Sequence, residues 1–239
     1  MSLIAPHQDY TEREPIPEDV YVACLYSFID VGTQTSKNPQ YDDKRQVILT
    51  WEIPAIMKVW QEDGPEEPAS ISAFYNFSMF TSKKGSKSNL LKVVNGWRGK
   101  ELTAEQAATF DFENLLAKWC QLQVIHHIKE SGDTIAKVAG VMKMIKGIEH
   151  PDSLHNPAVI WSVNQLDPGN DLLMQLPQVP EWQEKIIIKS QEFQAMLNQQ
   201  KQAANWEVPD DDKAPWTQQK QALGGWGKWK VPDDNDPLD

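Results

Sequence analysis

Long apolar stretches and a set of paired cysteines are both missing from this sequence. No run of about 18 consecutive apolar residues occurs, and the N-terminal stretch MSLIAPHQDYTEREPIPEDV is acidic without a long apolar core. Only two cysteines are present, Cys24 and Cys120, each inside an apolar segment. This usage fits reduced, buried thiols better than a disulfide framework. We therefore expect a cytoplasmic protein that is neither secreted nor inserted in a membrane.

The sequence signatures of catalysis and metal binding are missing as well. There is no phosphate-binding GxxxxGK[ST], no GxSxG turn, and neither a CxxC nor an HExxH spacing. His126 and His127 are adjacent in an expected strand, so their imidazoles point to opposite faces and cannot easily share one ion with Cys120. Carboxylates are abundant, but they occur mainly in loop-like segments, where they are ordinarily solvated. We expect no enzymatic activity, no metal site and no cofactor.

Positive charge is scarce overall but concentrated in one segment. The chain carries 23 Lys and Arg against 34 Asp and Glu, a formal net charge of −11. Residues 1–80 hold five basic and thirteen acidic side chains, whereas residues 81–100 hold six basic side chains and no acidic one. Such segregation gives a positive surface suited to a polyanion, although a solvated lysine-rich loop and helix face would give the same pattern. The candidate phosphate contacts are Lys83, Lys84, Lys87, Lys92, Arg98 and Lys100.

Aromatic residues lie in and beside this basic segment. The bases of single-stranded nucleic acid stack on such rings while lysines follow the phosphates. In the strand-like segment 71–80, alternation sets Phe74 and Phe80 on the face opposite to the set expected in the core. Trp97 stands next to a basic residue. The candidate stacking residues for DNA are therefore Phe74, Phe80 and Trp97.

The hydrophobic pattern predicts a mainly β protein with some α-helix. Strands are expected at 20–31, 45–53 and 71–80, followed by a hairpin at 119–129 and 134–145. Between the third and fourth strands, Ser88 and Thr103 should cap two helices, the first ending at Gly96. This order is that of an α+β fold with an OB-like five-stranded barrel and a helical insertion between strands 3 and 4. Other small β-barrels with an inserted helix would give the same order.

Composition divides the chain into four expected parts. Residues 1–19 form an extended N-terminal arm, because they hold prolines and acids without periodicity. Residues 20–180 form the OB-like DNA-binding domain, whose last part is loop-like. Residues 181–204 carry an apolar stripe typical of one helix. Residues 205–239 form a disordered acidic tail that contains tryptophan.

The tail contains a near-repeat. WEVPDDDKAP begins at Trp206 and WKVPDDNDPLD begins at Trp229. Residues 205–239 carry eight acids and four lysines, so the tail repels phosphates. It could instead fold back onto the basic segment and compete with nucleic acid, or recruit a basic partner. The two copies indicate either valency or drift of a linker.

The end of the tail resembles the acidic tip of bacterial single-stranded DNA-binding proteins, where aspartates precede a proline and a terminal apolar residue that docks partner proteins. This chain departs from that pattern because it ends Leu238-Asp239, without a terminal phenylalanine. The resemblance implies a partner-binding segment. With the second repeat included, its residues are Trp229, Pro232, Asp233, Asp234, Asp236, Pro237 and Leu238.

The folded part resembles a family of bacteriophage proteins associated with replication and recombination, which are regarded as OB-like single-stranded DNA binders. The resemblance covers about residues 20–145 and rests on WEIP, ISAFYNFSMF, KSNLLKVVNGWRGKELTAEQA and LLAKWCQLQVIHHI in combination. It implies sequence-independent binding of single-stranded DNA without catalysis, in the cytoplasm of an infected bacterium, with replication or recombination proteins as partners of the tail. The alternative, which the net charge favours, is a non-enzymatic interaction adaptor or structural component that uses its acidic tail. A homo-oligomer, a preference for RNA and an accessory enzyme subunit stay open.

Overall fold

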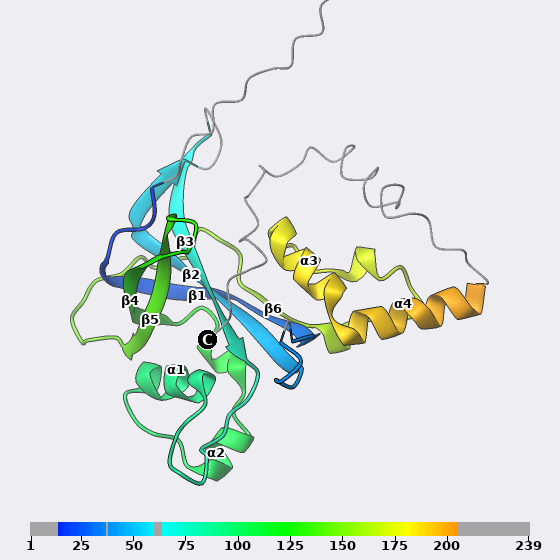
Figure 1. The fold of residues 1–239 in the computed structure, drawn as a ribbon. Helices are drawn as coiled ribbons and strands as arrows, with labels where there is room; N and C mark the ends of the chain where they lie inside the picture. The colour runs from blue at the N-terminus through cyan, green and yellow to red at the C-terminus, as the bar shows by residue number, and fades with distance from the viewer. Residues whose placement is uncertain (1–13, 37, 60–63, 205–239) are drawn as a thin grey trace, which may run out of the picture.

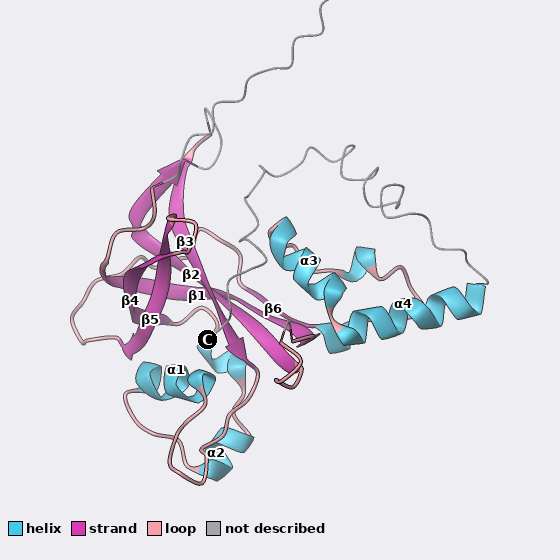
Figure 2. Ribbon diagram, in the orientation of Figure 1, coloured by secondary structure: helices cyan, strands magenta, loops and turns pink. Residues whose placement is uncertain are grey.

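The computed structural model describes residues 14–36, 38–59 and 64–204 of the chain. They form a six-stranded, mostly antiparallel sheet with helices against it, an α+β architecture (Figures 1 and 2). The strands are β1 (Asp19–Gln34), β2 (Lys44–Val59), β3 (Glu66–Asn76), β4 (Trp119–Ile128), β5 (Thr134–Lys143) and β6 (Val159–Ser162). The helices are α1 (Asn89–Arg98), α2 (Ala104–Ala108), α3 (Glu181–Lys189) and α4 (Gln191–Ala204). Within the described ranges, no helix has the length and apolar character that crossing a membrane requires.

The strand order is β3-β2-β1-β4-β5, and β6 pairs with β1 in parallel. β1 is shared by two antiparallel pairs, with β4 along its N-terminal part and with β2 along its C-terminal part, and the two pairings meet at Cys24. Two irregularities interrupt the pairing with β2, and Gly32 at the second has φ of 77°, which glycine adopts without a Cβ clash. Such bulges bend a strand and so curve the sheet. The strands β3 and β5, at the two ends of the strand order, approach each other to within 8 Å between Cα atoms.

The first hydrophobic core lies between one face of the sheet and α1. Strand residues of this core alternate along each strand, as the sequence pattern predicts, and α1 contributes one stripe at helical spacing. Its large, fully buried strand members are Leu25, Leu49, Trp51, Ile53 and Leu122, and its members from α1 are Leu90, Val93, Val94 and Trp97.

Both predicted helix caps are confirmed. The Ser88 hydroxyl accepts a hydrogen bond from the Leu91 N–H, and Thr103 forms a capping box with Gln106. The expected end of α1 at Gly96 is wrong, because the helix continues to Arg98 and is capped by Gly99 in a left-handed conformation. Gly96 instead permits close packing, since a Cβ there would lie 2.2 Å from the Val141 carbonyl oxygen of β5.

Part of the opposite face of the sheet, over the C-terminal part of β1 and the adjoining part of β2, is covered by residues 159–204, which we call the C-terminal unit (Figure 1). A second core joins sheet residues Ile29, Val31 and Ile48 to Trp161, Ile187 and Phe193 of this unit. This core crosses the expected boundary at residue 180, because β6 and the turns before α3 pack with the helices that follow. The single helix expected at 181–204 is two, since Ser190 is extended (ψ 151°) and its Oγ accepts from the Phe193 N–H.

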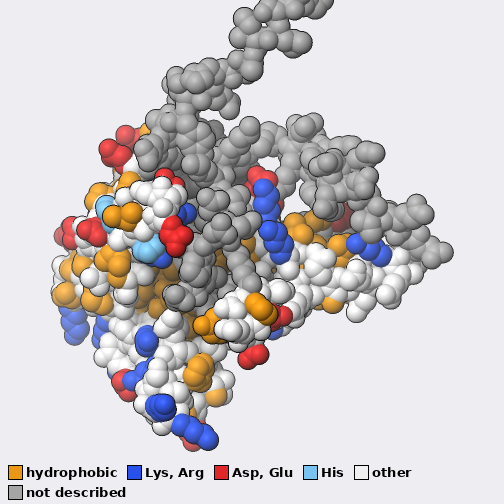
Figure 3. Space-filling view, in the orientation of Figure 1, with side chains coloured by type: hydrophobic (Ala, Val, Ile, Leu, Met, Phe, Trp, Pro, Cys, Tyr) orange, Lys and Arg blue, Asp and Glu red, His pale blue; other side chains and the backbone are white. Residues whose placement is uncertain are grey.

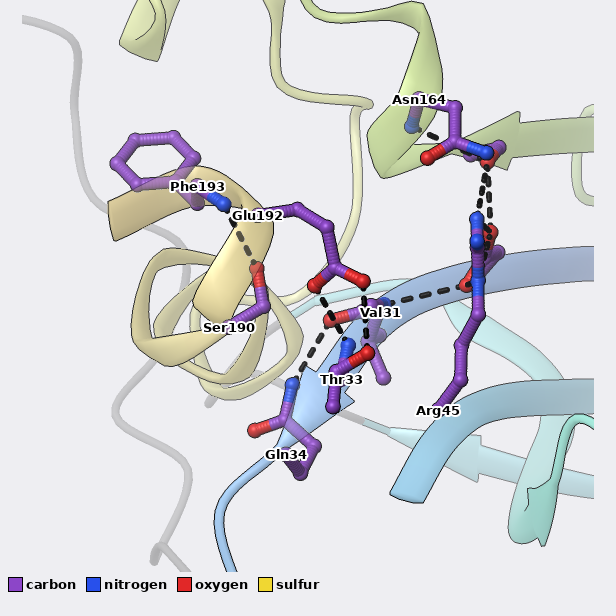
Figure 4. Close-up of polar contacts among 11 residues, drawn as sticks. Val31, Thr33, Gln34, Arg45, Asn164, Ser190, Glu192 and Phe193 are labelled. Carbon is purple, nitrogen blue, oxygen red and sulfur yellow. Dashed lines mark hydrogen bonds and ion pairs between the residues drawn. The ribbon is translucent and has the colours of Figure 1, made fainter. Parts of the chain in front are cut away.

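Polar contacts tie the C-terminal unit to β1 and β2 (Figure 4). The buried Asp30 carboxylate forms an ion pair with the Arg45 guanidinium, whose Nε lies 3.0 Å from Oδ1. It also accepts a hydrogen bond from the Ser162 hydroxyl at 2.6 Å. Glu192 accepts from the N–H and the hydroxyl of Thr33, both at 2.7 Å. Burial alone would raise the pKa of Glu192, but these two hydrogen bonds, together with its own backbone N–H and the charge of Arg45, lower the pKa below its ordinary value. The unit is thus held by charge-assisted hydrogen bonds as well as by its core.

Candidate nucleic-acid interface

A closed loop between β3 and α1, residues 80–88, presents two free lysines. At its base the Ser88 N–H donates to the Phe80 carbonyl oxygen at 2.9 Å. At its tip Gly85 has φ of 81°, and its N–H donates to the carbonyl oxygen of Ser82 at 2.8 Å. Lys83 and Lys84 are exposed at this tip. We call residues 80–88 the basic loop.

Helix α1 and the residues just after it carry further basic side chains. Lys92 is exposed on the helix, and Lys100 is exposed just after the cap. The Arg98 guanidinium lies 6.0 Å from the centroid of the Phe110 ring, a cation–π contact that holds it near the surface. A cation in the last turn of a helix also stabilises the helix dipole, so Arg98 has a structural role in addition to any ligand.

Two lysines differ from the expectation drawn from the sequence. Lys87 forms an ion pair with Glu101, the first acid after the basic segment, so its charge is partly neutralised. In contrast, Lys143 of β5 joins the basic residues, because its side chain crosses Gly99 so closely that a Cβ there would lie 2.9 Å from Lys143 Cδ. Residues 118–146 hold five lysines and two acids, a bias that a charge count continued past residue 100 would have revealed.

Basic residues are concentrated in this region of a protein of negative net charge. Figure 3 shows Lys and Arg side chains spread over the lower part of the molecule, around α1 and α2, with a few Asp and Glu side chains among them, whereas Asp and Glu side chains gather at the upper left, by the strand ends. We call this the basic surface. Its members are Lys83, Lys84, Lys92, Arg98, Lys100 and Lys143.

The three rings proposed for base stacking differ in how exposed they are. Phe80 is 55% exposed at the base of the basic loop, so it is accessible for stacking. Trp97 is only 6% exposed, packs 6.4 Å from the Trp51 ring, and donates its Nε1–H to the Trp119 carbonyl oxygen. Phe74 lies 5.7 Å from the Trp182 ring of α3, in the second core. The assignment of Trp97 to DNA contact is therefore corrected, because its ring is buried. The Phe74 ring is half-buried, and its contact with Trp182 covers part of the surface on which a base would stack.

An open hollow of about 380 Å³ lies between the end of β3 and α2. Phe77, Phe110 and Phe112 form its aromatic part, with Phe112 5.6 Å from Phe77 and 5.2 Å from Phe110. The small side chains of α2 leave the space open. We call it the aromatic hollow; its lining residues are Phe77, Ser78, Met79, Ala107, Ala108, Phe110 and Phe112. Sequence reasoning assigned Phe77 to the core and did not consider the rings that follow α2.

The residues considered and rejected as metal ligands do not converge. Among the described residues, no group of three or more His, Cys, Asp or Glu side chains is arranged to hold a metal ion. Cys24 and Cys120 are free and buried, as expected, and burial raises the pKa of Cys24 to about 12. The His126 ring nitrogen lies 2.9 Å from the Ile16 carbonyl oxygen.

Two sets of predicted residues fall outside the part of the chain that the structure describes. These are residues 1–13 of the expected N-terminal arm and the whole tail from residue 205. All partner-binding candidates are in the second set: Trp229, Pro232, Asp233, Asp234, Asp236, Pro237 and Leu238.

The comparisons with protein families and with curated proteins found no match. No protein-family model matches the chain, and no curated protein matches it. The case for a function therefore rests on the residues and their arrangement.

Proposed function

We propose that this protein binds single-stranded DNA without sequence preference, on the basic surface and the rings beside it. The observation that carries the proposal is the placement of free lysines and an exposed phenylalanine on one closed loop, next to the cationic end of α1. Lysines follow a phosphate backbone, and a ring such as Phe80 stacks on a base of any identity. Duplex DNA offers the phosphates but not the unstacked base faces, so single strands should bind more tightly.

The sheet is proposed to be an OB-like barrel. The path β3-β2-β1-β4-β5, the two helices between β3 and β4, and the approach of β3 to β5 all support this architecture. Many proteins of this architecture bind oligonucleotides on their strands and loops, so the proposed fold and function are compatible, although a fold by itself does not establish a function.

Binding to a labelled oligo(dT) strand, measured by fluorescence anisotropy over a salt series, tests the proposal. Unlabelled single-stranded and duplex DNA of equal length serve as competitors. We expect the single strand to compete better than the duplex and the affinity to fall as salt rises, because bound lysines release counterions. Equal competition by the duplex, or no binding at low salt, would contradict the proposal.

From the resemblance to phage proteins, we further propose that the protein acts in DNA replication or recombination in the cytoplasm of an infected bacterium. In that setting the acidic tail recruits replication or recombination proteins. The second candidate is a non-enzymatic adaptor that works through its tail, and the net charge of −11 favours it. A chain cut after Ala204 separates the two, because an adaptor would lose its partners, whereas a DNA-binding protein would keep its affinity for single strands.

A further inference from the structure

We propose that the aromatic hollow receives one unstacked base of the bound strand. This inference rests on the proposed function, because it assumes that single-stranded nucleic acid lies on the basic surface. It adds a second kind of contact: exposed Phe80 would stack on a base at the surface, whereas the hollow would take a base out of the strand.

The lining of the hollow suits a flat, uncharged ring. Phe77, Phe110 and Phe112 present aromatic surface, and no charged side chain is among the lining residues. Aromatic rings prefer offset or edge-to-face contacts with another π system, which a nucleobase supplies. A space of about 380 Å³ lies at the lower end of the range for small-ligand sites, so it fits a single ring system rather than a protein segment of several residues.

A cation stands where the phosphate of that nucleotide would lie. Arg98 contacts Phe110, which lines the hollow, and its guanidinium is half-exposed rather than covered. Arg45 lies 5.7 Å from the Phe77 ring on the same hollow, but its charge is already matched by Asp30. Among the described residues, Arg98 is thus a cation beside the hollow for which no ion pair with a carboxylate is seen. An uncharged hollow with a cation at its edge fits a nucleotide, whose base is neutral and whose phosphate is charged.

The binding of a base in the hollow can be tested by enlarging a small side chain of α2, which changes no charge. Ala108 lines the hollow and is exposed, so Ala108→Phe should fill the space while the fold is kept. Ala195, exposed on α4 and away from the hollow, gives the matched control Ala195→Phe. The full chain is titrated with labelled oligo(dT) over a salt series. We expect Ala108→Phe to weaken binding about 5- to 150-fold, the loss of one stacked base, with an unchanged salt slope. The control should bind as the wild type does.

Each outcome points to one conclusion. If the wild type binds single strands and Ala108→Phe binds equally well, the base is not in the hollow and the proposed function still stands. If the wild type does not bind, the proposed function itself fails. Tighter binding by Ala108→Phe would also overturn the inference, because it would mean that a tryptophan of residues 205–239 competes for the hollow. Should Ala108→Phe lower the melting temperature, Phe110→Leu, which keeps an apolar side chain but removes the ring, must weaken binding for the inference to survive.

Discussion

The close packing of α1 on β5 predicts an unusual result for Gly96→Ala. In an exposed helix interior, this change stabilises by about 1 kcal/mol, because alanine restricts the unfolded backbone more than glycine does. Here the added Cβ would lie 2.2 Å from the Val141 carbonyl oxygen, which is backbone and cannot rotate away. Relieving the contact requires α1 to move from β5 by about 1 Å, and overpacking of this kind costs up to about 3 kcal/mol.

Setting about 3 kcal/mol of overpacking against about 1 kcal/mol of helix propensity leaves a loss of about 2 kcal/mol. For a domain of this size, that corresponds to a melting temperature lower by about 4–8 °C in a thermal scan. Gly140→Ala, on the same strand, is the matched control: its Cβ meets nothing closer than 3.5 Å, so stability should change little. An unchanged or higher melting temperature for Gly96→Ala would refute the packing of α1 on β5. Because α1 carries Arg98, its displacement should also weaken binding of single strands at temperatures where the variant is folded.

Three further predictions follow from the described contacts. Lys83→Gln with Lys84→Gln should reduce the salt slope of binding to a single strand by about 1.4, two phosphate contacts at about 0.7 each, and an unchanged slope would place the phosphates elsewhere. Phe80→Ala should weaken binding by about 1–3 kcal/mol with the melting temperature kept, whereas Trp97→Ala should destabilise the fold by about 3–5 kcal/mol; the reverse pattern would contradict their burial. Since the pKa of Glu192 is lowered in the folded protein, its stabilisation is present above the ordinary glutamate pKa and is lost as pH falls through the lowered value. In thermal scans the advantage of the wild type over Glu192→Gln should shrink over that acidic range, and a constant difference would exclude the linkage.

The strands and caps were predictable because their signals are local. Alternation along 45–53 and 71–80 is a property of neighbouring residues, as are the hydroxyls of Ser88 and Thr103 at the starts of helices. What alternation could not show is that part of the second face of the sheet, over β1 and β2, is also covered. Ile48 is fully buried although it faces away from the first core, because the C-terminal unit packs there. That contact joins segments more than a hundred residues apart, which no short pattern reveals.

The charged residues of the candidate site could be predicted from the sequence, whereas the exposure of its aromatic rings depends on packing and could not. Free lysines at 83 and 84 follow from an acid-free segment that forms a loop. Trp97 was misassigned because it stands beside Arg98, although its spacing from Leu90 and Val94 puts it on the buried stripe of α1. Helical periodicity is therefore a better guide to the orientation of this ring than the charge of the neighbouring residue.

The covered second face also restricts where a strand of DNA could run. If the sheet is an OB-like barrel, the surface of β2 and β3 is one place where such proteins bind oligonucleotides. In this chain, Phe74 and Ile48 on that side lie under α3 and the rest of the C-terminal unit. The unit is also fastened by the hydrogen bonds from Thr33 to Glu192 and from Ser162 to Asp30. Uncovering the face would expose a hydrophobic core and remove one hydrogen-bond donor from the buried Asp30 carboxylate, which is costly. A bound strand would therefore lie against the loop, α1 and the aromatic hollow, where cations and rings are already accessible, rather than across the sheet.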